Sequence, residues 1–246
     1  MRDYALERDK RVAFIREAVK KAGASGIVFG SSGGKDSALV GILCKLACDN
    51  TVGVIMPCQS RRNYEEDTVD ALELGRQYNI RTITIDLSPV KQALVDEASK
   101  EIQPSPMALA NIGPRLRMTT LYTVAASENL LVAGTGNRSE IYMGYFTKYG
   151  DGGYDINPIA DLTATEVFEF LRFLNAPEAF LTKAPSAALF EGQTDEQEMG
   201  LTYDELDGYI LTGEGQPEVI AKIESAHAKT EHKRRPALIY TDPETK

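Results

Sequence analysis

A glycine-rich turn between an apolar run and an amphipathic pattern constrains the fold of this chain more than any other feature. Residues 27–29 are apolar and typical of a short strand, and residues 38–46 have helical apolar spacing. The turn between them reads Gly30-Ser31-Ser32-Gly33-Gly34-Lys35-Asp36-Ser37. A strand, a turn and a helix in that order aim backbone N–H groups and the positive end of the helix dipole at one point. The sequence therefore predicts an anion-binding loop here.

The side chains of this loop narrow down the kind of anion. Gly33 and Gly34 let the backbone approach a ligand closely. The hydroxyls of Ser32 and Ser37 add hydrogen-bond donors. Asp36 is unexpected, because a carboxylate among phosphate-binding amides repels the ligand unless a cation lies between them. We therefore expect Mg²⁺ to bridge Asp36 and phosphate oxygens. The loop differs from a P-loop, in which the lysine and the hydroxyl residue are adjacent.

The stretch from Ser32 to Ser37 resembles the Ser-Gly-Gly-x-Asp-Ser loop of the ATP pyrophosphatases. Those enzymes hold the pyrophosphate that ATP loses when a carboxylate or a carbonyl is adenylated. The resemblance implies ATP as a substrate and makes residues 30–37 its predicted binding loop. An ordinary glycine-rich turn is the alternative, but every motif position matches between a predicted strand and a predicted helix.

The spacing of apolar runs predicts the fold class. Strand-like runs at 51–56, near 83–85 and at 130–133 alternate with helical patterns. We predict an α/β fold: a doubly wound parallel sheet with helices on both faces and extra C-terminal helices, binding ligands at the carboxyl ends of its strands. The strands at 27–29 and 130–133 both enter glycine-rich loops, so we expect them to be neighbours beside one crevice. No linker is evident, and residues 1–246 are predicted to form a single domain.

Finer expectations concern the helices. Val69 and Leu72 are predicted to face the core, and residues 90–102 carry one apolar stripe. Gly113-Pro114 is predicted to break the pattern before the next helix. Residues 183–200 are polar and without clear periodicity, and structureless loops longer than roughly 12–15 residues are often lids.

Composition excludes several functional classes. A net charge of −9 disfavours nonspecific nucleic-acid binding, which depends on a basic surface. With only two histidines, a histidine-rich zinc site is implausible, so any metal is expected to have oxygen ligands. We find no apolar signal core and no run long enough to span a bilayer. We therefore expect a soluble cytoplasmic protein without nucleic-acid or membrane partners.

A second glycine-rich loop follows the run at 130–133, with the sequence Gly134-Thr135-Gly136-Asn137-Arg138-Ser139-Glu140. It lacks the third glycine of the dinucleotide-binding fingerprint. Glu140 is predicted to be the second carboxylate for the metal, because Mg²⁺ commonly takes one or two carboxylates together with phosphate oxygens. The alternative is a solvated glutamate near a helix start.

A wider set of motifs makes the resemblance specific. The irregular run 144–155 is rich in glycine, aromatic and charged residues, and further motifs lie at 183–187, 192–196 and 232–234. Together with the two loops they resemble the ammonia-dependent NAD synthetases, from about residue 10 to residue 236. The resemblance implies that ATP adenylates the nicotinate carboxylate of deamido-NAD, pyrophosphate leaves, and ammonia displaces AMP to give NAD. It also implies a homodimer.

The resemblance assigns roles to individual positions. It implies that Asp36 and Glu140 hold Mg²⁺ and that Thr135 and Ser186 contact ATP. The positions implied for deamido-NAD are Arg115, Lys148, Asp155, His232 and Lys233. Asp151 is our candidate for the proton acceptor, because ammonium becomes a nucleophile only after losing a proton. Its alternative role is that of a turn residue in Gly-Asp-Gly-Gly.

Two departures from related enzymes are informative. The family usually has a lysine where this chain has Ala164, so we expect Lys35 or Lys183 to compensate, or the activity to be low. Arg2 stands where an N-terminal-nucleophile glutaminase needs cysteine, and the length leaves no room for a nitrilase-like glutaminase domain. Free ammonia is therefore the expected substrate. The alternatives are another adenylating enzyme of this loop class, GMP-forming or tRNA-modifying, and a nonenzymatic adenine-nucleotide-binding protein.

Overall fold

The computed structural model describes residues 2–58, 66–182 and 195–241. Within them, parallel strands form one sheet in the order β3-β2-β1-β4. The strands are β1 (Gly26–Gly30), β2 (Thr51–Ile55), β3 (Arg81–Thr84) and β4 (Leu130–Ala133). Phe29 of β1 is in register with Ala133 of β4, so these two strands end together. The predicted parallel sheet and the predicted pairing of its first and fourth strands are confirmed.

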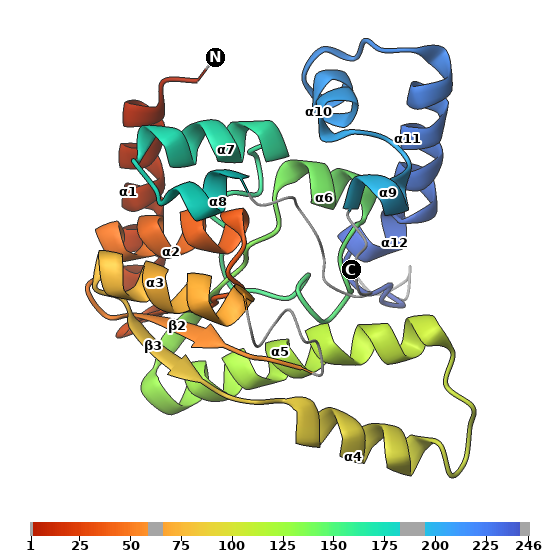
Figure 1. Ribbon diagram of the computed structural model, residues 1–246, viewed down its shortest axis with the longest axis horizontal. Coiled ribbons are helices and arrows are strands. Elements are labelled where there is room, and N and C mark those ends of the chain that lie inside the picture. Colours follow the sequence, from red (N-terminus) through yellow and green to blue (C-terminus); the bar gives the residue numbers. More distant parts are fainter. Residues whose placement is uncertain (1, 59–65, 183–194, 242–246) are drawn as a thin grey trace.

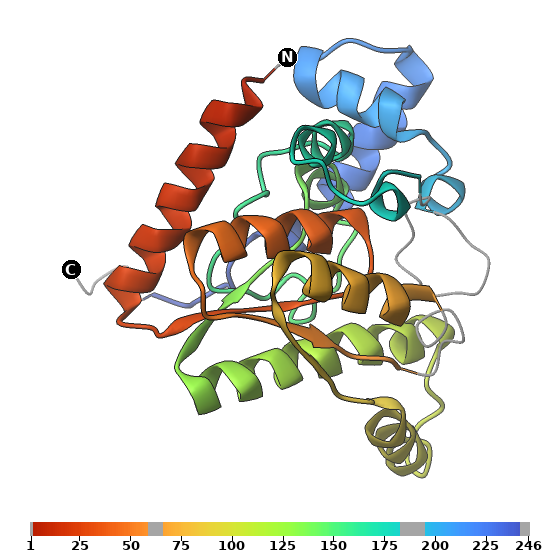
Figure 2. The same cartoon turned by 60° about the vertical axis from the view of Figure 1, so that its left-hand side comes forward.

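Helices cover both faces of the sheet, as Figures 1 and 2 show. One face is covered by α1 (Tyr4–Ala22) and α2 (Lys35–Ala47), and α7 (Ala164–Phe173) and α8 (Glu178–Thr182) pack against α2 and extend the same apolar core. The other face packs on the long α5 (Pro106–Glu128). Successive side chains of β1 alternate between these layers: Ile27 and Phe29 join the first core and Val28 the second. Burial on both faces explains why β1 and β4 carry no polar side chain.

The C-terminal part adds helices beside this layered core, as predicted. These are α6 (Arg138–Met143), α9 (Asp195–Met199), α10 (Tyr203–Thr212), α11 (Pro217–Lys229) and α12 (Glu231–Arg234). Met143, Leu206 and Ile223 form a separate apolar cluster among them. Among the described residues, no helix combines the length and the apolar character needed to cross a membrane.

The predicted inward face of α3 (Thr68–Tyr78) is wrong. Val69 and Leu72 are 60% and 48% exposed, whereas Ala71, Leu74 and Gly75 are buried. A Cβ at Gly75 would lie 2.3 Å from the Thr82 hydroxyl of β3. This close approach of helix and strand needs a glycine, and it sets the rotation of α3 about its axis.

The predicted break at Gly113-Pro114 is corrected by tertiary packing. α5 runs without interruption through Gly113 and Pro114, both of which are buried. Its contacts with β1 and β4 hold the helix together despite the backbone hydrogen bond that proline removes. The apolar stripe of α4 (Ser88–Ala98) is exposed, since no residue of this helix is buried. Of the predicted lid at 183–200, residues 195–199 form α9, and residues 183–194 lie outside the described residues.

Candidate active site

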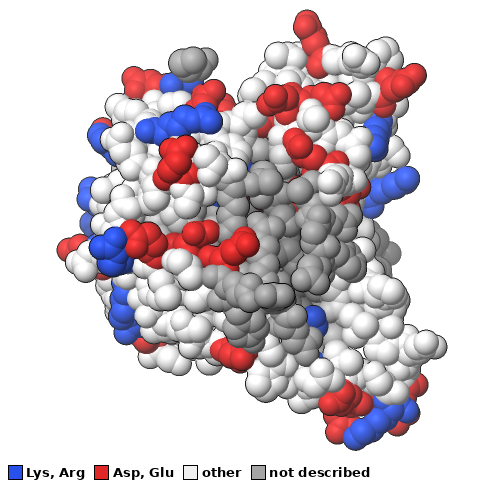
Figure 3. All heavy atoms as spheres, in the orientation of Figure 1, with Lys and Arg blue, Asp and Glu red and all other residues white. Residues whose placement is uncertain are grey.

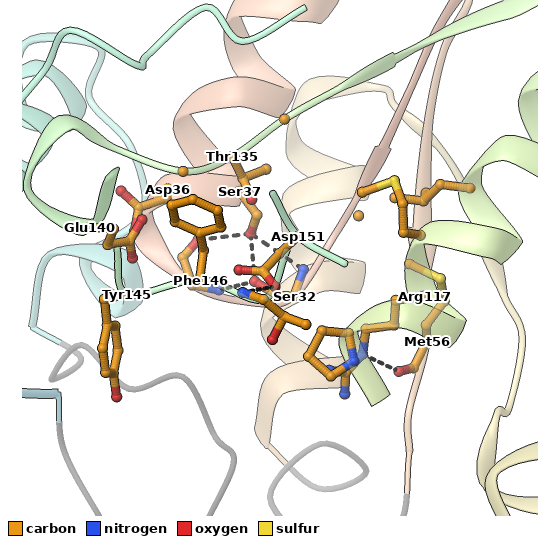
Figure 4. A pocket seen from close by; sticks show the side chains of 18 of the residues that line it. Ser32, Asp36, Ser37, Met56, Arg117, Thr135, Glu140, Tyr145, Phe146 and Asp151 are labelled. Carbon is orange, nitrogen blue, oxygen red and sulfur yellow. Dashed lines mark hydrogen bonds between the residues drawn. The ribbon is translucent and has the colours of Figure 1, made fainter. Parts of the chain in front are cut away.

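A pocket of about 620 Å³ opens at the carboxyl ends of β1 and β4. Both glycine-rich loops line it, together with α5, residues 144–147 and α9. In a doubly wound sheet this edge is the expected ligand position, because the strand order reverses there. Figure 4 shows Asp36 and Glu140 on one side of the pocket, Arg117 on the other and Asp151 between them.

The first loop is held open for an anion. α2 begins at Lys35 after the N-cap Gly34, which has no capping side chain, so the first N–H groups of the helix stay available to a ligand. Gly33 has φ +74°, and a Cβ there would lie 2.4 Å from the Asp67 carbonyl oxygen. The Ser37 hydroxyl donates to the Gly34 carbonyl at 2.9 Å, and the Ser32 hydroxyl donates to the Ser37 hydroxyl oxygen at 3.1 Å. These contacts fix the turn around one point.

Asn137 brings the two predicted metal carboxylates together. Its side-chain amide donates to Asp36 Oδ1 at 3.0 Å, and its backbone N–H donates to Glu140 Oε2 at 2.9 Å. Asn137 is also the N-cap of α6, because its Oδ1 accepts from the Glu140 N–H. The residue is fully buried. Loops from the ends of β1 and β4 are thus joined through one side chain.

Among the described residues around Asp36 and Glu140, carboxylates outnumber the cations, with Lys35 facing Asp36, Glu140 and Asp195. Burial and the neighbouring Asp36 raise the pKa of Glu140 well above its usual value, although Lys35 opposes the shift. Lys35 is itself 5% exposed, with Nζ 2.6 Å from Asp36 Oδ2. Burial would lower the pKa of Lys35, but the charges of Asp36, Glu140 and Asp195 raise it instead.

This excess of carboxylate oxygens suits a hard divalent cation. In the part of the chain that the structure describes, no group of three or more His, Cys, Asp or Glu residues forms a complete metal site. Mg²⁺ does not need one, since it is usually held by one or two carboxylates plus substrate phosphates and water. Asp36 and Glu140 therefore fit a magnesium ion that arrives with a phosphate ligand.

The surface does not attract anions in general. Acidic side chains gather over α3 and over α9 and α10 on the face seen in Figure 3. Anion binding in the pocket therefore depends on the loop amides, the helix dipole and local cations rather than on the overall field.

Asp151 lines the same pocket, and Figure 4 shows it between the two carboxylates and Arg117. One carboxylate oxygen accepts the Thr147 N–H at 3.0 Å. The surrounding protein raises the pKa of Asp151 by desolvation, while Thr147, Arg117 and Lys233 act in the opposite direction. Lys233 donates to the carbonyls of Gly144 and Phe146, both at 2.8 Å. A titratable carboxylate thus stands among fixed donors and cations.

The structure gathers most of the predicted site residues into this pocket. Besides Asp36, Glu140 and Asp151, the predicted residues that line it are Gly30, Ser31, Ser32, Gly34, Lys35, Ser37, Thr135 and Lys233. Gly33 supports the loop from beneath, against Asp67. Ser186 and Lys183 lie outside the described residues.

The remaining predicted residues lie on the surface outside the pocket. Lys148 Nζ donates to the His232 carbonyl at 2.5 Å, and Arg115 Nε donates to the Lys148 carbonyl at 3.4 Å. The Asp155 carboxylate accepts from the Val132 N–H at 2.8 Å and also from the Tyr122 hydroxyl. Arg115, Lys148 and His232 therefore form one connected group, and Asp155 is attached to the edge of β4.

Sequence reasoning missed three polar residues of the site. Arg117 lines the pocket and donates to the Met56 carbonyl at 3.1 Å, and burial lowers its pKa. Asp195 is 3% exposed and accepts a hydrogen bond from the Tyr203 hydroxyl. Its negative charge also raises the pKa of Lys35. Asn137 had a detectable signal, because Asn followed three residues later by Glu is a capping-box pattern. Asp195 lies in the motif at 192–196, but the resemblance gave it no role. Arg117 belongs to no motif, so only the fold brings it to the pocket.

The family of the chain follows from its sequence over nearly its full length. A family model described as NAD synthase matches residues 7–237. The chain belongs to the NAD synthase family. An NH(3)-dependent NAD(+) synthetase of Carboxydothermus hydrogenoformans is 50% identical over 95% of this chain and 96% of its own. The predicted family and fold are confirmed.

Solved structures of NAD synthase relatives agree in fold. A protein described as an NMN synthetase from Francisella tularensis superposes with a TM-score of 0.92 at 37% identity, covering 98% of this chain and all of its own. An NH3-dependent NAD synthetase from Campylobacter jejuni, in complex with nitrate, gives a TM-score of 0.81 at 30% identity, with 98% and 100% coverage.

Ala164, the position at which the resemblance led us to expect lysine, is fully buried at the start of α7. Its N–H donates to the Ser139 hydroxyl at 3.0 Å. The Asp207 carboxylate accepts from that hydroxyl and from the Thr165 N–H. The Ser139 hydroxyl and the Asp207 carboxylate therefore accept hydrogen bonds from the first N–H groups of α7.

Proposed function

We propose that the chain is a C–N-bond-forming ligase that converts deamido-NAD, ATP and free ammonia to NAD, AMP and pyrophosphate. The observation that carries this proposal is the junction at Asn137, which holds Asp36 and Glu140 together at the mouth of an uncapped glycine-rich loop. Membership of the NAD synthase family and the names of its relatives support it. A passive nucleotide sensor has no need for two facing carboxylates.

In the first chemical step a nicotinate carboxylate oxygen attacks the α-phosphorus of ATP, and the bond from that phosphorus to the β-bridging oxygen breaks. Residues 30–37 hold the departing pyrophosphate through backbone N–H groups, with Thr135 on the facing loop. Asp36 and Glu140 would hold Mg²⁺, which, when bound, offsets charge on the phosphates. Ser186 is a further proposed ATP contact.

In the second step ammonia attacks the adenylated carbonyl carbon, and AMP leaves with the oxygen that joined the two. Asp151 is the proposed acceptor of the proton that ammonium must lose. Its raised pKa brings a carboxylate closer to the range useful for a general base. Arg117 and Lys233 flank Asp151 and favour its ionised form.

Only the nicotinate end of deamido-NAD reacts, so the rest of the dinucleotide is free to bind outside the catalytic part of the pocket. We propose that Lys233 contacts its reacting half, while Arg115, Lys148, Asp155 and His232 bind the remainder at the surface. A homodimer with this surface near the subunit boundary is part of the proposal. All three cysteines are free thiols, which is typical of a reducing compartment, so we also propose a cytoplasmic location.

A mononucleotide acceptor is the second candidate. The neighbour with a TM-score of 0.92 is described as an NMN synthetase, and NMN is the mononucleotide half of NAD. Of the five residues proposed to bind deamido-NAD, only Lys233 lines the pocket. Nicotinate mononucleotide does not need the four surface residues to place its carboxylate at the same reacting position.

Competing the two acceptors tests both proposals. We expect a higher kcat/KM for deamido-NAD than for nicotinate mononucleotide, and Lys148→Ala is expected to reduce this ratio. A higher kcat/KM for the mononucleotide would reassign the acceptor. Product formation with neither acceptor would reject the proposed reaction.

A further inference from the structure

Lys35 is a buried cation that the proposed reaction does not require by itself. Its side chain is 4% exposed and leads from the first residue of α2 into the protein. Nζ lies 5.5 Å from the Phe168 ring centroid on α7 and 5.8 Å from that of Tyr203 on α10. A lysine this deeply buried needs an anionic partner to offset its desolvation.

That partner is Asp36, and both carboxylate oxygens of Asp36 are engaged. Asn137 donates to Oδ1 at 3.0 Å, and Lys35 Nζ lies 2.6 Å from Oδ2. Glu140 and Asp195 add negative charge within electrostatic reach of the same ammonium group. The Lys35 ammonium therefore occupies the position at which a divalent cation would meet Asp36.

A triphosphate offers Lys35 an alternative partner. The residue lines the pocket together with Ser32, Gly34 and Ser37 of the loop, so a phosphate bound there would compete with Asp36 for its ammonium group. A lysine ammonium on a flexible four-carbon stem can exchange one anion for another. When it does so, one oxygen of Asp36 becomes free.

We propose that Lys35 is the resident counter-ion of Asp36 and Glu140 and makes metal binding depend on bound nucleotide. Without nucleotide, the ammonium excludes the metal from Asp36. With nucleotide, it moves to the phosphates and the metal takes its place. By linkage, the metal then strengthens nucleotide binding by the same factor. This inference rests on the proposed metal role of Asp36 and Glu140.

The test measures metal binding directly rather than turnover. Mn²⁺ replaces Mg²⁺ at oxygen-ligand sites, and electron paramagnetic resonance counts the free ion. Titrations of wild type, Lys35→Met and Lys35→Arg are run without nucleotide and with an ATP analogue whose α–β bridge is a methylene group. Lys45→Met is the matched control, since Lys45 lies at the far end of the same helix and pairs with Asp49.

We expect Lys35→Met to bind Mn²⁺ at least ~10-fold more tightly than wild type without nucleotide, because a nearby positive charge is gone. The analogue should strengthen Mn²⁺ binding in wild type and Lys35→Arg, but much less in Lys35→Met. Lys45→Met should match wild type. Circular dichroism and the thermal midpoint check that each variant is folded.

Two outcomes separate the possible failures. If Lys35→Met and wild type bind Mn²⁺ equally without nucleotide, Lys35 is only a structural ion pair and the inference is wrong. If Asp36→Asn leaves Mn²⁺ binding with the analogue unchanged, the proposed metal site itself is wrong, whatever Lys35 does.

Discussion

Replacing Asn137 by alanine removes both its contact with Asp36 and its capping of α6. In the structure this side chain caps α6 through Oδ1 and donates to Asp36 through its amide. Loss of an N-cap costs about 0.5–2 kcal/mol, and loss of a hydrogen bond to a charged group costs about 1.5–3 kcal/mol. We therefore expect Asn137→Ala to lower the free energy of unfolding by roughly 2–5 kcal/mol.

Thr202→Ala supplies the matched control. Thr202 caps α10 in the same capping-box geometry, with Glu205 at the third position, and it is exposed. Its loss should cost only the cap, about 0.5–2 kcal/mol. Urea unfolding of both variants at constant m-value gives the difference, which measures the contact with Asp36 together with the burial of the Asn137 side chain.

Activity gives the second measurement for this pair. Asn137 is a positioning residue, and loss of a group that orients a metal ligand typically reduces metal affinity or activity about 10–100-fold. We expect the Mg²⁺ concentration for half-maximal activity to rise by such a factor in Asn137→Ala and to stay unchanged in Thr202→Ala. Equal stability losses together with unchanged Mg²⁺ dependence would refute the role of Asn137.

The remaining predictions concern single groups of the site. Asp36→Ala should lower turnover by at least ~10²-fold, the scale of losing one electrostatic stabiliser, and wild-type rates would remove Asp36 from the mechanism. Asp151→Asn should spare adenylate formation and slow amide formation in rapid-quench assays; equal loss in both steps would reject its role. Ala164→Lys fills buried space and should cost about 1–3 kcal/mol by urea unfolding; an unchanged ATP KM would show that a cation there is unimportant. Burial and Asp36 raise the pKa of Glu140, so the folded metal-free protein loses stability as pH rises from the ordinary glutamate pKa to the raised one. Glu140→Gln should therefore raise the urea midpoint of the metal-free protein at pH above that window, and a lower midpoint would contradict this.

Local patterns carried most of the fold prediction. The strand, glycine-rich turn and helix around residues 26–47 are encoded in neighbouring residues, and the alternation of apolar runs predicted the parallel sheet. The rotation of α3 depends instead on the contact between Gly75 and Thr82, which periodicity does not reveal. Similarly, α5 continues through Pro114 because the sheet supports it.

In the candidate site, too, some residues could be predicted from the sequence and others only from the fold. The need for a second carboxylate followed from the chemistry of Asp36, and the structure brings Glu140 to it through Asn137. Arg117 belongs to no motif, and Asp195 lies in a motif that gave it no role, so only the fold places these two side chains in the pocket. The metal and the roles of Arg115, Lys148, Asp155 and His232 stay predictions.

Oxygen transfer tests the central proposal most directly. Deamido-NAD carrying ¹⁸O in its nicotinate carboxylate is mixed with the protein, ATP, Mg²⁺ and ammonium, and AMP is analysed by mass spectrometry. Adenylation of that carboxylate predicts one ¹⁸O atom in each AMP and one NAD formed per AMP. Unlabelled AMP, or ADP in its place, would show that the carboxylate is not activated through its adenylate.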